Sequence, residues 1–118
     1  MMKKGVLMMT VAQIADTLGL TVFSAPEPDR EVSGGYVGDL LSWVMGRAQA
    51  GQAWITIMSN QNVAAVAALS DVACVILTEG VQPDPDLLKK AQVQGINLLG
   101  TGKGSFHMAV DLNGVLQA

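Results

Sequence analysis

Residues 53–58 read AWITIM, a nearly continuous apolar run that ends in the polar stretch SNQN. Two similar runs follow it: VACVIL (72–77), which ends in TEG, and INLL (96–99), which ends in GTGKG. Such runs are typical of strands that are buried on both faces, as in parallel sheets. The segments between them, 59–71 and 78–95, are long enough for the crossover that a parallel pair of strands requires.

Helix signals fill these connecting segments. NVAAVAALS follows the capping residue Asn60, and PDLLKKAQVQ has Asp84 at its cap, Pro85 at its first position and Gly95 after its end. Because strands alternate with helices in this way, the sequence predicts an α/β domain with a parallel sheet.

The flanking segments predict further elements of the same domain. TVAQIADTLGL is expected to form a helix, because Thr10 and Gln13 have the capping-box spacing and Gly19 is a natural stop. LTVFSA (20–25) is expected to form a strand, and SFHMAVDL a last helix capped by Ser105. We therefore expect a single domain over residues 1–118.

DREVSGG (29–35) lies between the two halves of this pattern and places two glycines ahead of the helical-looking DLLSWVMGRA. Glycines before a helix either cradle a phosphate or let the chain turn. We interpret Gly34 and Gly35 as a tight turn into a helix that runs from Asp39 to about Ala48. The apolar stripe of this helix is predicted to consist of Leu40, Leu41, Val44, Met45 and Ala48.

The composition bears on partners. Half of the 118 residues are hydrophobic and only 14% are charged, against about 25% in a typical soluble domain. We expect a second copy of the chain to cover the apolar surface that remains, which makes the protein a homodimer. The net charge of −3 and the scattered positions of the seven basic residues are evidence against nucleic-acid binding.

The sequence has few features that indicate a cellular compartment. The apolar part of MMKKGVLMM (1–9) is too short for a signal peptide, and no run reaches the length of a membrane span. Cys74 lies alone in VACVIL, where we expect a small buried side chain rather than a disulfide. These observations predict a cytoplasmic protein that does not associate with membranes.

GTGKGS (100–105) is the stretch most similar to a phosphate-binding loop, but its glycines do not have the spacing of a known phosphate-binding motif. A Walker loop would need glycine at Asn97 and serine or threonine at Gly104, and the dinucleotide fingerprint would need glycine at Ser105. We interpret the stretch as a strand-to-helix turn whose backbone amides remain candidates for an anion. His107, the only histidine, has no neighbours with ligand spacing, so we expect neither a metal site nor a catalytic role there.

Small or polar residues follow each of the three predicted strands. In open α/β sheets ligands bind beyond the carboxyl ends of the strands, so these residues are candidates for a binding site. The alternative is that they serve only as caps and turn residues. No nucleophile with an adjacent base is visible, which favours binding over catalysis, although Glu79 remains the one acidic residue to consider. The strand-end set comprises Ser59, Asn60, Thr78, Glu79, Thr101 and Gly102.

DREVSGGYVGDLLSWVMG (29–46) resembles the signature region of the DRTGG domain family, and the similarity continues through WITIMSNQNVAAVAAL, VACVILTEG and INLLGTGKGSF. It therefore covers nearly the whole chain. Two positions depart from the pattern: Ser33 replaces the threonine, and Trp43 stands where a short polar residue is expected, which favours an aromatic contact with a partner. The motif positions are occupied by Asp29, Arg30, Ser33, Gly34 and Gly35, with Glu31 and Val32 lengthening the motif.

The resemblance implies a three-layer α/β/α module with a largely parallel sheet of four to five strands, similar to the N-terminal domain of HPr kinase/phosphorylase. DRTGG modules accompany CBS domains in some inorganic pyrophosphatases and precede the catalytic part of some phosphotransacetylases. In these settings the module is regulatory or dimer-forming, and the chemistry lies elsewhere in the chain.

We therefore expect a non-catalytic regulatory module that dimerises and senses a small anionic metabolite, such as a nucleotide or an acyl phosphate, without a cofactor. Arg30, beside Ser33, Gly34 and Gly35, is the best-placed cation for such a ligand. A ligand-free interaction subunit of a metabolic enzyme is the first alternative, and a small phosphotransfer enzyme is the second.

Overall fold

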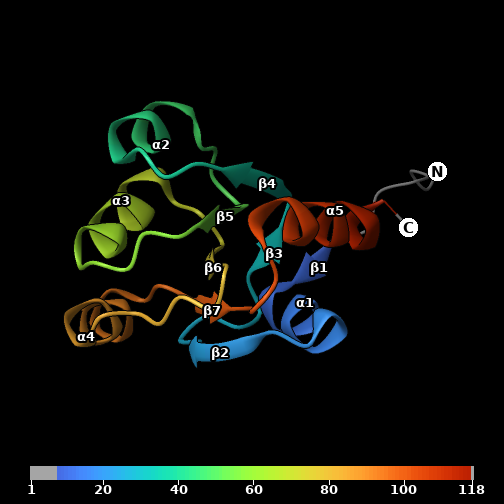
Figure 1. The fold of residues 1–118 in the computed structure, drawn as a ribbon, viewed down its shortest axis with the longest axis horizontal. Helices are drawn as coiled ribbons and strands as arrows, with labels where there is room; N and C mark the ends of the chain where they lie inside the picture. The colour runs from blue at the N-terminus through green and yellow to red at the C-terminus, as the bar shows by residue number, and fades with distance from the viewer. Residues whose placement is uncertain (1–7, 118) are drawn as a thin grey trace.

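The computed structural model of the chain describes residues 8–117, so most of the MMKKGVLMM segment lies outside the described residues. Figure 1 shows helices on both sides of a central sheet. The elements are β1 (Met9–Thr10), α1 (Val11–Leu18), β2 (Thr21–Ser24), β3 (Glu31–Val32), β4 (Gly34–Val37), α2 (Leu41–Arg47), β5 (Gln52–Thr56), α3 (Asn62–Ser70), β6 (Cys74–Leu77), α4 (Pro85–Gln94), β7 (Leu98–Gly100) and α5 (Ser105–Leu116).

The main sheet has five strands in the order β2-β7-β6-β5-β4. β4, β5, β6 and β7 are parallel, and β2 joins β7 in the antiparallel direction. β1 and β3 form a separate small antiparallel pair, in which Met9 lies opposite Val32. The prediction of a largely parallel sheet is confirmed, and β5, β6 and β7 form at the three apolar runs that predicted them, although β5 begins one residue earlier, at Gln52, and β7 extends one residue further, to Gly100.

The sheet separates two hydrophobic cores, as a three-layer fold requires. On one face, α1 and α5 pack against alternate strand residues such as Ile55, Ile76 and Leu99. On the other face, α2, α3 and α4 pack against the residues between them, such as Trp54 and Val75. Figure 1 shows α2, α3 and α4 together on the left of the sheet and α1 and α5 on the right. The α/β/α expectation is therefore confirmed.

Several helix ends follow the predicted signals. Thr10 and Gln13 form a reciprocal capping box at the start of α1, and Gly19 ends the helix in the left-handed conformation. Pro85 begins α4 and Gly95 ends it, again with a left-handed backbone. Among residues 8–117, no helix combines the length and the apolar character that crossing a membrane would require.

The interpretation of Gly34 and Gly35 as a turn into a helix is wrong. Both residues belong to the extended strand β4, and α2 begins only at Leu41. A Cβ on Gly35 would lie 3.0 Å from Cδ2 of Leu112, so the glycine allows α5 to approach the strand. The Asp39 carboxylate does not cap α2, because it accepts hydrogen bonds from Thr56 and Ile57 at the end of β5.

Other local expectations also need correction. Gly104, not Ser105, is the cap of α5, and Ser105 is its first residue. Asp84 occupies the cap position of α4, but its side chain makes no capping hydrogen bond. The predicted apolar stripe of α2 is only partly buried: Val44 is fully buried, whereas Leu40 and Met45 are half exposed.

Candidate functional site

The cation of the family motif, Arg30, forms an ion pair within the chain. Its guanidinium lies 2.8 Å from the carboxylate of Asp71 and also donates a hydrogen bond to the Asp71 backbone carbonyl. Asp71 follows α3 and has a left-handed backbone, so it lies in the turn that leads into β6. Arg30 therefore ties the start of the motif to the amino-terminal end of the central strand.

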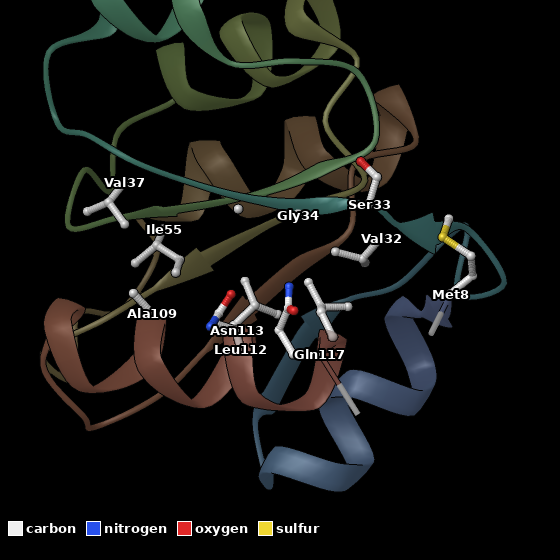
Figure 2. A pocket seen from close by; sticks show the side chains of 12 residues that line it. Met8, Val32, Ser33, Gly34, Val37, Ile55, Ala109, Leu112, Asn113 and Gln117 are labelled. Carbon is white, nitrogen blue, oxygen red and sulfur yellow. The ribbon is translucent and has the colours of Figure 1, made fainter. Parts of the chain in front are cut away.

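The small residues of the motif form the strand at the edge of the sheet. The backbone N–H of Ser33 donates to the carbonyl of Gly51, just ahead of β5, and Gly34 and Gly35 then pair with Gln52 and Ala53. The Ser33 hydroxyl points away from α5 (Figure 2) and lies beside Gly51. This geometry lays the motif alongside β5 rather than around an anion.

A cleft of about 290 Å³ opens between this edge and helix α5. Figure 2 shows Ile55 from the sheet and Leu112 and Asn113 from α5 pointing toward one another across it. Most of the lining is apolar, and the side chains of Asn113 and Gln117 add amide groups. No lining residue is charged. The full lining is Met8, Val32, Ser33, Gly34, Gly35, Val37, Ile55, Ala109, Leu112, Asn113, Leu116 and Gln117.

The strand-end residues follow the carboxyl ends of β5, β6 and β7. The Ser59 hydroxyl donates to Asp84, and the side-chain oxygen of Asn60 accepts from the N–H of Asn62. Thr78 is fully buried, and its hydroxyl lies 2.7 Å from that of Ser105. These side chains therefore use hydrogen-bonding groups within the chain.

The turns after β6 and β7 are also bonded to each other. Glu79 has a left-handed backbone with φ of 61°, and its N–H donates to the carbonyl of Lys103. The Thr101 hydroxyl accepts from the N–H of Lys103, while the Thr101 carbonyl accepts from Gly80. Gly102 lies exposed in the same turn. Caps and turns thus account for most of the predicted strand-end set.

Arg30 and the strand-end residues do not meet. Arg30 contacts Asp71, which precedes β6, whereas Thr78 and Glu79 follow the last residue of that strand. The two parts of the predicted ligand site consequently lie at opposite ends of the sheet, and the cleft beside Gly34 and Gly35 is separate from the contacts of Arg30.

Comparison with known proteins agrees with this motif and fold. The sequence pattern of the DRTGG domain family matches residues 13–115. The chain belongs to the DRTGG domain family. A search of curated proteins gave no match.

The DRTGG fold has a solved relative in the CBS and DRTGG domains of the regulatory region of Clostridium perfringens pyrophosphatase, determined with its activator diadenosine tetraphosphate. The TM-score is 0.70 at 18% sequence identity, and the match covers 89% of this chain and 48% of the other. This DRTGG chain therefore spans about half the length of that structure. Similarity to HPr kinase/phosphorylase stays a prediction.

Trp43 of the DRTGG domain lies on the outside of α2, where its side chain is 53% exposed. The guanidinium of Arg47 stacks over its ring at 3.8 Å from the ring centre. Leu40 and Met45 on the same segment are also half exposed, as is Val37 in β4. The contact of Trp43 with a partner remains a prediction.

Two titratable groups of the DRTGG domain have shifted pKa values. Burial raises the pKa of the Cys74 thiol to about 12, slightly opposed by the charge of Arg30. The hydrogen bond from Lys103 lowers the pKa of Asp111, helped by the charges of Lys103 and His107. Within residues 8–117, no group of three or more histidine, cysteine or acidic residues could hold a metal ion.

The cleft is the feature that sequence reasoning missed. It depends on the approach of α5 to β4, two elements about 70 residues apart in the chain, and no local pattern reports such an approach. One feature of the sequence did point to the cleft. A glycine inside a strand often marks a site where another part of the molecule comes close, and Gly35 is such a residue in this DRTGG domain.

Proposed function

We propose that this chain is a non-catalytic regulatory domain that senses a small metabolite in the cleft between β4 and α5. The observation that carries the proposal is the position of this cleft: the glycines of the family motif form one of its walls. Gly35 leaves out the side chain that would otherwise press on Leu112, so the motif itself shapes the wall that a ligand would contact.

The chemistry of the lining suits binding. Ligand sites are typically concave and mostly apolar, with a few polar groups that fix orientation. Here Ile55, Leu112 and Leu116 supply apolar surface, and the amides of Asn113 and Gln117 can both donate and accept hydrogen bonds. Such a lining favours a flat, uncharged group with a polar edge, for example a nucleobase.

An anionic group of the same ligand would lie outside the cleft, because no cation lines it. Ala109 in the lining is one helical turn from Ser105, the first residue of α5. A ligand longer than the cleft would reach this helix start, where backbone N–H groups and the helix dipole favour negative charge. A nucleotide or an acyl phosphate combines the two kinds of group.

The regulatory role is supported by the solved relative, whose DRTGG domain belongs to the regulatory region of a pyrophosphatase that has a nucleotide activator. By analogy, we propose that this domain acts on a metabolic enzyme and works as a homodimer in the cytoplasm. The strand-end residues and Arg30 remain two further and separate candidate places for an anion.

A thermal-melt screen of the full chain against nucleosides, nucleotides, dinucleotides, acyl phosphates and coenzyme A tests the proposal. A ligand at about 100 times its dissociation constant adds about 2.7 kcal/mol to the free energy of unfolding, which raises the melting temperature by several degrees. Asn113→Leu should remove the shift, because the leucine cannot orient a polar ligand. Asn62→Leu, an exposed asparagine on α3 away from the cleft, should keep it.

Three other outcomes of these measurements would change the proposed ligand site or the proposed function. A shift that Arg30→Ala abolishes and Asn113→Leu does not would move the site to the Arg30 end of the sheet. No shift from any compound would favour a ligand-free interaction subunit. Turnover of a phosphate donor that is lost in Glu79→Gln would favour a phosphotransfer enzyme.

A further inference from the structure

A second groove lies between α1 and β2, apart from the cleft beside α5. It has a volume of about 450 Å³ and shares no lining residue with that cleft. The buried side chains of Leu20 and Leu99 and the half-exposed side chain of Val22 give it an apolar surface. An apolar hollow of this kind at the surface is typical of a site that contacts another molecule.

The wall that α1 contributes to this groove consists of small residues. Ala12, Ala15 and Gly19 line it at positions i, i+3 and i+7 of one helix face. A Cβ on Gly19 would meet no atom within 4 Å, so no described residue fills the space beside it. Because the distance between two packed helices depends on the side chains at their contact, these residues let another helix approach α1 closely.

The opposite wall, on β2, does not suit an added strand. β2 has a bulge between Val22 and Ser24, and Pro26 and Pro28 follow it. Both features keep a sheet edge from pairing further. On this face of the sheet the helical layer consists, within residues 8–117, of α1 and α5, whereas three helices cover the other face (Figure 1). A helix is therefore the element that fits beside α1.

The charge of the groove indicates what this helix carries. Asp16 is the one charged residue among the described residues that line it. Its side chain is exposed and, within residues 8–117, takes part in no ion pair. Arg30 and Lys103 are held by other carboxylates. The remaining cations of this range belong to α2 and α4, in the other helical layer: Arg47, Lys89 and Lys90. A cation that complements Asp16 is therefore expected from a partner.

We propose that the groove binds an amphipathic helix of another protein, packed alongside α1, with a lysine or arginine that pairs with Asp16. Such a helix presents apolar residues at i, i+3 or i+4, and i+7 to the groove, which is a common mode of peptide recognition. α1 has eight residues, a length of about 12 Å, so about two turns of the partner helix contact it. This proposal deepens the proposed function and rests on it for the partner, because the regulated enzyme supplies the helix.

Selection from a displayed library of helical peptides, randomised along one face and applied to the full chain, tests the groove. The selected peptides are expected to combine apolar residues at helical spacing with a lysine or arginine beside them. Fluorescence anisotropy then measures their binding to variants. Ala12→Trp fills the groove and should abolish binding, whereas Ala68→Trp, at an exposed alanine on α3 in the other layer, should keep it.

The charge of Asp16 is tested with the same peptides. Asp16→Lys replaces an attraction by a repulsion, so binding of a basic peptide should weaken by about tenfold. Binding should recover when the basic residue of the peptide is replaced by glutamate. Asp86→Lys, at an exposed acid on α4, is the matched control, because it changes the net charge equally without touching the groove. Far-ultraviolet circular dichroism establishes that each variant keeps the fold.

A library that yields no binder overturns the proposal, and so do peptides that bind Ala12→Trp as tightly as the wild type. Light scattering that shows a wild-type dimer separated by Ala12→Trp also overturns it, because a second copy then occupies the groove. The melt screen reports on the proposed function separately. Peptide binding without any ligand shift keeps the groove and rejects the sensor, and a ligand shift without peptide binding does the reverse.

Discussion

The two edges of the main sheet are built in opposite ways. β2 pairs antiparallel with β7, has a bulge between Val22 and Ser24, and runs into a segment that contains Pro26 and Pro28. β4 pairs parallel with β5 and carries two glycines without a charge, a proline or a bulge. Bulges and prolines keep an edge from taking up another strand, so the β2 edge is closed and the β4 edge is open.

At each edge of the sheet, a buried side chain forms hydrogen bonds to the segment that follows the edge strand. Asn97 holds the turn after β2, because it bonds both the N–H and the carbonyl of Glu27 and also reaches the carbonyl of Ala73. On the other side, the indole N–H of Trp54 donates to the carbonyl of Gly38, just after β4. The closed edge is thus held by a polar network, and the open edge by Trp54, which is fully buried and also donates a hydrogen bond.

The largest effect is expected at the open edge, from Trp54→Ala. Trp54 is fully buried, and its removal leaves a cavity between β5 and the helices α2 and α3. The free energy of unfolding should fall by about 3–5 kcal/mol, as measured by urea titration. Trp43→Ala is the matched control, since this indole is half exposed and its contact with Arg47 is worth only about 0.5–1 kcal/mol. Equal losses in the two variants would contradict packing as the source of order at this edge.

The closed edge should respond less, and through polar groups. Asn97→Ala leaves the N–H of Glu27 and the buried carbonyl of Ala73 without this partner, while the Glu27 carbonyl keeps the N–H of Arg30. Unpaired buried groups of this kind cost about 1–3 kcal/mol. Asn113→Ala, at an exposed position, should change stability by no more than about 0.5 kcal/mol. If Asn97→Ala unfolds at the same urea concentration as the wild type, the polar network does not hold the β2 edge.

Sequence patterns were sufficient for the middle of this sheet and failed at the open edge. β5, β6 and β7 were predictable because each is apolar on both faces, and α1 was predictable from Thr10, Gln13 and Gly19. Gly34 and Gly35 have low strand propensity, and their extended conformation comes from pairing with β5. Pairing with β5 determines the structure of this segment, and the local sequence pattern, which does not include that pairing, predicts a turn.

The candidate site was also only partly predictable from the sequence. The polar residues at the strand ends were predicted as candidates for a binding site, and in the structure caps and turns account for most of them. The cleft was not expected, because it exists only through the distant helix α5. Arg30 was expected to serve as the cation for an anionic ligand, and in the fold its guanidinium forms an ion pair with Asp71.

The central strand β6 lies between the two edges and gives a prediction on pH. The thiol of Cys74 has its pKa raised by burial from 9.0 to about 12. Below about pH 9 both the folded and the unfolded chain keep the proton, so nothing is lost. Between about 9 and 12 only the unfolded chain releases it, and the free energy of unfolding falls by about 1.4 kcal/mol per pH unit.

Urea titrations at pH 8 and pH 10 measure this loss as the difference between the wild type and Cys74→Ala. The other titrating groups are common to both proteins, so the difference isolates the thiol. The wild type should lose more stability than the variant on going to pH 10. If the free energy of unfolding falls equally in both proteins, the folded chain tolerates the Cys74 thiolate. The centre of the sheet would then be more accessible to water than its burial indicates.

The smallest effect is expected where the motif enters the open edge, at the pair of Arg30 and Asp71. Both side chains reach solvent, with 28% and 64% of their surface exposed. Such pairs contribute about 0–1 kcal/mol, so Arg30→Ala should lower stability only slightly, and added salt should reduce the difference from the wild type. Urea titration at low and high salt measures both effects.

This small cost makes Arg30 informative about function. Because Arg30→Ala is expected to stay folded, its effect on a ligand-induced melting shift can be attributed to binding. Asp71→Ala is the control, since it breaks the same ion pair but keeps the cation. A shift that survives Asp71→Ala and disappears in Arg30→Ala would place an anion at Arg30, at the amino-terminal end of the central strand. A shift that survives both variants and disappears in Asn113→Leu would instead assign the ligand to the cleft at the open edge.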